Sequence, residues 1–168
     1  MKKVIVVPYD EKWKQEFERI KAELLCALGG HVLAIEHVGS TSVEGLAAKP
    51  VIDIDVVMKD YNVFETVKEK LAQIEYIHEG DLGIKDRQAF KYAEKPHLMK
   101  HHLYVCPGYS EELKRHLAFR DYLRIHPEDR DWYGEVKMLA AKQHPEDIDR
   151  YMAAKGPCIA EIIQRCAL

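Results

Sequence analysis

The stretch Pro50-Val51-Ile52-Asp53-Ile54-Asp55-Val56-Val57-Met58 decides the fold. Its apolar and β-branched residues predict a strand, and side chains alternate between the two faces of a strand. One face carries only apolar residues, at the even positions from 52 to 58, and is a core face. The other face carries Asp53 and Asp55 between two valines. This pattern predicts a strand that is covered on both sides, with a local acidic hole.

The two aspartates are candidate metal ligands and candidate catalytic residues. Two positions along a strand place Asp53 and Asp55 about 7 Å apart. At an effective dielectric of ~20, two such charges repel by roughly 2 kcal/mol. A bound Mg²⁺ (or Mn²⁺) would turn this repulsion into attraction, because hard cations take carboxylate oxygens and keep positions open for phosphate. The alternative is a pair of strand-end aspartates that accept hydrogen bonds from turn amides.

A turn of small residues precedes this strand, after an expected strand over residues 32–38. Glycine lets a backbone approach a ligand closely, and hydroxyl groups beside backbone amides at a helix start suit phosphate oxygens. Gly39, Ser40 and Ser42 are therefore candidate phosphate-binding residues, although an ordinary turn capped by serine has the same sequence. The twelve residues up to Asp53 contain two breaks, which predicts that the turn and the aspartates share one cleft wall.

Several basic residues are candidate partners for the same phosphate ligand. Lys49 lies four residues before Asp53 and is the nearest cation in the sequence. Arg120 and Arg124 are four apart, so they share a helix face and favour a joint anion site. The other candidates are Arg87, Lys137 and Lys155. For each of these residues the alternative is a solvated surface position.

The expected strand over residues 98–105 places Lys100, His102 and Tyr104 on one face. His102 is a candidate catalytic residue on that face, as a base, a metal ligand or a phosphate contact. A buried histidine bonded to the backbone is the alternative. His101 points to the opposite face, so the two histidines do not share a zinc ion easily.

The remaining sequence indicates a mixed α/β half followed by a helical half. Apolar residues at helical spacing predict helices between Asp10 and Gly29 and over residues 64–74. Residues 4–7 form a short β-prone run, and short strands are expected within residues 76–92. Three further helices are expected after Ser110, the last interrupted at Gly156-Pro157. The order predicts an α+β fold in a single domain, residues 1–168.

Composition restricts the partners of this chain. Its 25 basic and 28 acidic residues give a formal net charge of -3, which provides no broad cationic field and disfavours nucleic acid, although a local basic groove is compatible with it. No apolar run reaches the roughly 20 residues that cross a bilayer, and the N-terminal run is too short for a signal peptide. The four cysteines form no CxxC pair, so we expect reduced thiols in a cytoplasmic protein.

Four stretches resemble the GrpB family and together span nearly the whole chain. They are Val7-Pro8-Tyr9-Asp10 with Trp13, much of residues 37–54, His102-Leu103-Tyr104-Val105, and residues 119–124 with Pro127. The Gly39-Ser40 pair followed by Asp53-Ile54-Asp55 also resembles the nucleotidyltransferase signature, in which Gly-Ser binds triphosphate and the paired acids bind a divalent metal. The resemblance implies a nucleotidyltransferase-like mixed β-sheet flanked by helices, with a helical C-terminal half.

The resemblance leaves two functional hypotheses. The first is a metal-dependent nucleotidyltransferase that moves a nucleotidyl group from a nucleoside triphosphate to an unknown acceptor, with Lys49 and Arg87 stabilising charge on the phosphoryl group. The second is a non-catalytic module that binds a nucleotide or coenzyme. Active nucleotidyltransferases often carry a third carboxylate on a later strand, and its absence from residues 98–105 favours the module. Some family members are similar to a domain fused to dephospho-CoA kinase, which implies a link to coenzyme A metabolism.

Overall fold

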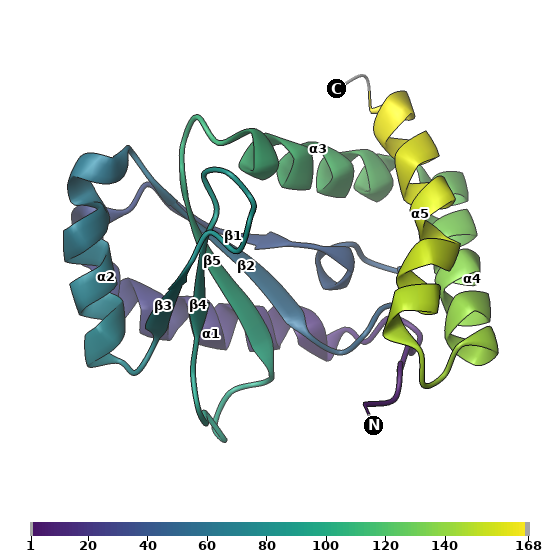
Figure 1. Ribbon diagram of the computed structural model, residues 1–168, viewed down its shortest axis with the longest axis horizontal. Coiled ribbons are helices and arrows are strands. Elements are labelled where there is room, and N and C mark those ends of the chain that lie inside the picture. Colours follow the sequence, from purple (N-terminus) through teal and green to yellow (C-terminus); the bar gives the residue numbers. More distant parts are fainter. Residues whose placement is uncertain (1, 167–168) are drawn as a thin grey trace.

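A computed structural model describes residues 2–166 and shows five α-helices around a five-stranded sheet (Figure 1). The strands are β1 (Ala34–Val38), β2 (Ile52–Met58), β3 (Ile77–Gly80), β4 (Gln88–Lys91) and β5 (His101–Pro107). The α-helices are α1 (Lys12–Leu28), α2 (Phe64–Gln73), α3 (Glu111–Ile125), α4 (Pro127–Gln143) and α5 (Ile148–Arg165). The predicted order, a mixed half before a helical half, is confirmed.

The strand order β1-β2-β5-β4-β3 makes the sheet mixed. The β2 and β5 strands run parallel, whereas every other pair is antiparallel. In this register Asp53 lies between Val38 at the end of β1 and His102 of β5. The sheet therefore brings the Gly-Ser turn, which follows Val38, next to the first aspartate.

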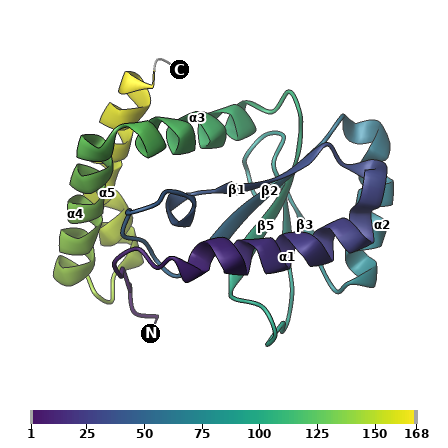
Figure 2. The same cartoon turned by 180° about the vertical axis from the view of Figure 1, so that it is seen from behind.

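One face of the sheet is closed by α1 and α2. The α1 helix lies behind the sheet in the view of Figure 1 and in front of it in Figure 2, and α2 stands at the left in Figure 1. The apolar residues of β2 on this face are fully buried against Trp13, Phe17 and Ile20 of α1 and Val67 of α2. Leu103 and Val105 of β5 belong to the same cluster. This face is the main hydrophobic core, as the even positions of β2 predict.

The opposite face is covered only in part, by α3. A small cluster of Val57, Cys106 and Leu113 joins α3 to the β2 and β5 strands. The α4 and α5 helices stand at one end of the sheet and pack on each other rather than over its centre (Figure 1). The side of β2 that carries Asp55 is thus buried, which confirms a strand covered on both sides. No helix within residues 2–166 combines the length and apolarity needed to cross a bilayer.

The structure differs from the expected elements at three places. Residues 4–7 form no strand, and Val7 makes only an isolated bridge to Ala48. The last strand begins at His101 rather than at residue 98. The prediction of a helix break at Gly156-Pro157 is wrong, since α5 continues through these residues. Because Ala153 and Pro157 are exposed, the carbonyl that loses its hydrogen bond remains accessible to water, and packing on α4 holds both halves in line.

Candidate functional site

The Gly39 backbone packs directly against the Asp53 carboxylate. Gly39 has a φ of 73°, and a Cβ atom at this position would collide with Asp53 Oδ2. Glycine is required here both for the left-handed backbone and for the close approach. Ser40 and Asp53 line one pocket, so the predicted adjacency of the turn and the aspartate strand is confirmed.

The turn is held by side chains on its buried side. His37 contacts Thr41 Oγ1 through Nε2 at 2.9 Å and stacks on Phe17 with 4.6 Å between ring centroids. Burial, with the nearby charges of Arg124 and Arg120, lowers the pKa of His37 to about 4. His37 is therefore neutral near pH 7 and acts as a rigid hydrogen-bonding support for the turn.

Arg120 and Arg124 of α3 also support the turn from behind. Arg124 donates to the Ser42 carbonyl oxygen from Nε at 3.0 Å and from Nη2 at 2.8 Å. Arg120 donates from Nη1 to Glu36 Oε2 at 2.7 Å and to the His37 carbonyl oxygen at 3.1 Å. Neither arginine lines the pocket beside Ser40, so the structure does not bring these two predicted phosphate contacts to it. The Ser42 side chain is likewise turned inward, with Oγ donating to the Gly39 carbonyl oxygen.

Each aspartate has a histidine partner. Asp53 Oδ1 lies 2.9 Å from His102 Nδ1, and both side chains are partly exposed. Asp55 is completely buried, and its Oδ2 lies 2.6 Å from His116 Nδ1. The other ring nitrogen of His116 lies 3.1 Å from Glu112 Oε1. His116 lies 61 positions after Asp55 and was not among the predicted site residues, because nothing in the spacing of α3 marks a contact with β2.

The Asp55 and His116 side chains form a charged pair. Burial raises the pKa of Asp55, and the hydrogen bond to His116 offsets only part of this rise. Burial alone would lower the pKa of His116, but its bond to Asp55 and the charges of Asp55, Glu112 and Asp53 raise it above the ordinary value. Carboxylates face both ring nitrogens, so we assign the pair as imidazolium and carboxylate.

A small cavity of about 120 Å³, which we call the lysine pocket, lies between the turn and the C-terminal helices. Asp53 and His102 face it from the sheet, and Ser40 and Thr41 face it from the turn. Three lysines face it from other elements, which are Lys49, Lys137 of α4 and Lys155 of α5. The pocket therefore joins residues that are far apart in the sequence and has cations around one carboxylate.

Lys137 is the most buried of these cations. It is 2% exposed, and its Nζ has no hydrogen-bond partner among residues 2–166. Burial, with the charge of Lys155, lowers its pKa to about 7. Burial and the charge of Lys49 lower the pKa of Lys155 to about 8. The Lys137 Nζ lies 4.4 Å from the Tyr133 ring centroid, which leaves its hydrogen bonds unmade. A buried amine without a hydrogen-bond partner is costly, and an anion in the pocket would remove that cost.

Arg87 lies on the same face of the sheet but outside the lysine pocket. Its guanidinium stacks 4.3 Å from the Tyr104 ring centroid, and Tyr104 is the register partner of Asp55 in β5. The Arg87 Nε atom is buried without a partner in the described part of the chain. Arg87 is thus near the second aspartate, with a free hydrogen-bond donor.

The two aspartates fit a hard cation. Asp55 Oδ1 is buried, and no described residue hydrogen-bonds to it, so a carboxylate oxygen is free to bind a metal. Within residues 2–166 no group of three or more His, Cys, Asp or Glu side chains is placed to hold a metal. Asp53 and Asp55 would therefore supply two ligands, and water and phosphate oxygens would supply the others, as Mg²⁺ sites commonly have.

Known proteins match this chain over nearly its whole length. The family model described as GrpB protein matches residues 3–165. The protein YqkA of Bacillus subtilis is 34% identical over 158 residues, which cover 94% of this chain and 46% of YqkA. A dephospho-CoA kinase of Mycolicibacterium paratuberculosis is 28% identical over 187 residues, covering 96% of this chain and 46% of that enzyme. The chain thus spans about half the length of both relatives.

Solved structures show the same relationship. The conserved protein GrpB from Enterococcus faecalis is similar with a TM-score of 0.80 at 34% identity, over 96% of this chain and 98% of that chain. The Cid1 poly(U) polymerase bound to MgATP is similar with a TM-score of 0.56 at 10% identity, over 79% of this chain and 42% of that chain. The second likeness shows the fold alone, and the fold is nucleotidyltransferase-like. The family model and the E. faecalis structure agree over almost all of the sequence, and this chain belongs to the GrpB family.

Proposed function

We propose that this chain binds a nucleoside triphosphate through the lysine pocket and transfers its nucleotidyl group to an acceptor. One observation carries the proposal: Lys137, whose buried Nζ has no hydrogen-bond partner in the described residues and lies over the Tyr133 ring, lines the same pocket as Ser40 and Asp53. A phosphate group would supply the missing acceptor oxygens and the missing negative charge.

The size and charge of the lysine pocket suit only one part of the ligand, its phosphate groups. A cavity of about 120 Å³ accommodates phosphate groups but not a whole nucleotide, so the nucleoside lies outside it. Lys49, Lys137 and Lys155 surround the phosphates, while Gly39 lets the backbone of the turn come close to them. Lys137 and Lys155 therefore join the phosphate contacts, whereas Arg120 and Arg124 position the turn.

Asp53, Asp55 and His102 would take part in the transfer step itself. Mg²⁺ or Mn²⁺, held by Asp53 and Asp55, would neutralise charge on the transferring phosphoryl group. The carboxylate of Asp53 accepts from His102 Nδ1, so Nε2 of His102 is free to take a proton. In the transfer, an oxygen or nitrogen of the acceptor bonds to the α-phosphorus, the bond to the bridging oxygen breaks, and pyrophosphate leaves. The acceptor's proton passes to His102 Nε2.

A non-catalytic module is the second candidate, and specific contacts favour it. Both aspartates already have histidine partners, and β5 carries no carboxylate. The likeness to part of a dephospho-CoA kinase connects this alternative with coenzyme A metabolism. Either function is consistent with a cytoplasmic protein, where triphosphates are abundant and the free thiols of Cys26, Cys106, Cys158 and Cys166 stay reduced.

A thermal-shift screen of nucleoside triphosphates, nucleoside monophosphates and coenzyme A, with and without Mg²⁺ or Mn²⁺, tests both functions. Stabilisation that requires a triphosphate and a metal supports the transferase. Stabilisation by a nucleotide or coenzyme without metal supports the module. In both cases Lys137→Met should abolish the shift and Lys142→Met, an exposed lysine on the same helix, should keep it. Equal shifts in the two variants would contradict the lysine pocket as the phosphate site.

A further inference from the structure

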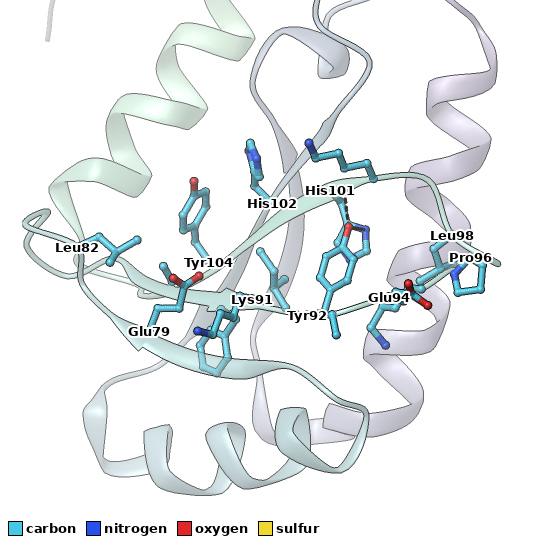
Figure 3. A pocket seen from close by; sticks show the side chains of 16 residues that line it. Glu79, Leu82, Lys91, Tyr92, Glu94, Pro96, Leu98, His101, His102 and Tyr104 are labelled. Atoms are coloured by element: carbon cyan, nitrogen blue, oxygen red, sulfur yellow. Dashed lines mark hydrogen bonds between the residues drawn. The ribbon is translucent and has the colours of Figure 1, made fainter. Parts of the chain in front are cut away.

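A large groove of about 740 Å³ lies on the open face of the sheet, over β4 and β5. Figure 3 shows His102 and Tyr104 rising from β5 on the same side. Glu79 and Leu82 flank them on one side, and Leu98 lies on the other. A volume of this size matches small-molecule sites in proteins, which are roughly 300–1,000 Å³.

The groove meets the lysine pocket at one residue. His102 lines both hollows, and it is bonded to Asp53. A molecule in the groove would therefore approach the phosphates from the side opposite to the lysines. This is the arrangement that two substrates need when a group passes between them, because the reacting atoms must meet at about 3–3.5 Å.

The lining of the groove argues against a nucleic-acid ligand. Lys95 donates to the Ile74 carbonyl oxygen at 2.8 Å, so it is committed to the protein. The charged side chains of the groove, Lys95 included, are Lys91, Lys95, Lys100, Glu79 and Glu94, which sum to +1. Single-stranded nucleic acid is bound by a positively charged groove with exposed aromatic platforms. A groove with a net charge of only +1, and with one of its three lysines bonded to the protein, provides little of the first feature.

Two aromatic residues of the groove each have one ring face stacked within the protein. The Tyr104 ring has Arg87 stacked on it at 4.3 Å from the centroid. The Tyr92 ring is stacked on His101, with 4.6 Å between centroids. One face of each ring is therefore covered by another side chain of the protein. The apolar walls of the groove come instead from Leu82, Leu98 and Pro96.

We propose that this groove binds the acceptor, and that the acceptor is a small molecule with an apolar body, a hydroxyl or amino group and no net charge. The inference rests on the proposed function, because an acceptor presupposes a transfer. The reactive group of the acceptor points to His102, and the apolar body lies between Leu82 and Leu98.

Benzyl alcohol, which has an apolar ring and one hydroxyl, is the probe. Its binding is followed by protein NMR without nucleotide or metal, in the intact chain. We expect saturable binding at millimolar concentration that shifts the signals of β4 and β5. Leu82→Asn should weaken it about tenfold, since an apolar contact is lost. Asparagine tolerates the positive φ of 52° at this position. Leu33→Asn, at an exposed leucine outside the groove, should leave binding unchanged.

Two further titrations complete the test. An oligouridylate should not displace benzyl alcohol, whereas ATP with Mg²⁺ should bind together with it. Displacement by the oligouridylate, an absence of benzyl alcohol binding, or an unchanged affinity in Leu82→Asn would overturn the proposal. Competition between ATP and benzyl alcohol would place the nucleotide in the groove and also overturn it. Failure of ATP to bind at all, with benzyl alcohol still bound, would instead reject the proposed function and the acceptor role but keep the groove as a ligand site.

Discussion

The two faces of β2 have the same backbone but opposite energetic roles. On one face Ile52, Ile54, Val56 and Met58 are fully buried in an apolar core. On the other, Asp55 is equally buried but pairs with His116, and the partly exposed Asp53 pairs with His102. Burial of the first face stabilises the fold, whereas burial of the second costs free energy that the histidines offset only partly. The strand therefore places a destabilised site on a stable support.

Ile54→Ala should cause the largest loss of stability and so test the core face. A completely buried isoleucine leaves a cavity when truncated, and the free energy of unfolding should fall by about 3–4 kcal/mol. Urea unfolding at pH 7 measures this change. Val57→Ala, on the other face of the same strand, should cost about 1 kcal/mol. Similar losses for the two variants would contradict the contrast between the faces.

His116→Leu should show that the second face depends on its ion pairs. The variant leaves Asp55 buried without its partner, and the free energy of unfolding should fall by about 2–3 kcal/mol, below the usual range because His116 is partly exposed. Burial raises the pKa of Asp55, so the carboxyl takes up a proton readily and the loss should shrink as the pH is lowered. Urea titrations at several pH values measure it, with His31→Leu as an exposed control expected to change little.

Lys137 should make stability depend on pH in the opposite sense to a salt-bridged lysine, whose pKa is raised by folding. Its pKa is about 7 in the folded chain and 10.5 as the ordinary value, so the unfolded chain binds more protons between these limits. The free energy of unfolding should therefore rise with pH above 7, by roughly 1–3 kcal/mol for this residue. The difference between wild type and Lys137→Met across pH 6–10 isolates the contribution. A constant difference would show that Lys137 does not titrate in this range.

Asp53→Asn should have the smallest effect on stability and the clearest effect on metal binding. The Asp53 charge already has His102 beside it, so removing it should change the free energy of unfolding by less than about 1 kcal/mol. Mg²⁺ or Mn²⁺ binding should be lost, as calorimetric titration can measure. Retained metal affinity would reject Asp53 as a ligand. Following the His102 ring by NMR gives a second reading, because added Mg²⁺ should disturb it in wild type and not in the variant.

The sequence predicted the strand, the turn and their adjacency because these depend on local patterns. Alternation along β2 defined both faces, and the Gly39-Ser40 turn lay only a short distance from Asp53 in the chain. The repulsion expected between two bare aspartates is reduced in the structure, since Asp55 is paired with His116 and Asp53 accepts a hydrogen bond from His102. The His116 contact depends on how α3 docks, which no spacing specifies. The direction of the Arg120 and Arg124 side chains also depends on how α3 docks. Their spacing of four residues is equally typical of a helix face that supports a turn and of one that binds an anion.

The lysine pocket also connects the two halves of the chain. Ser40 belongs to the mixed half, and Lys137 and Lys155 belong to helices about one hundred positions later. A phosphate ligand would therefore act as a removable cross-link that forms only after the C-terminal helices have docked. It would bind the folded state alone and raise stability in proportion to the logarithm of its concentration. A chain shortened after α3 would keep both aspartates and lose this cross-link.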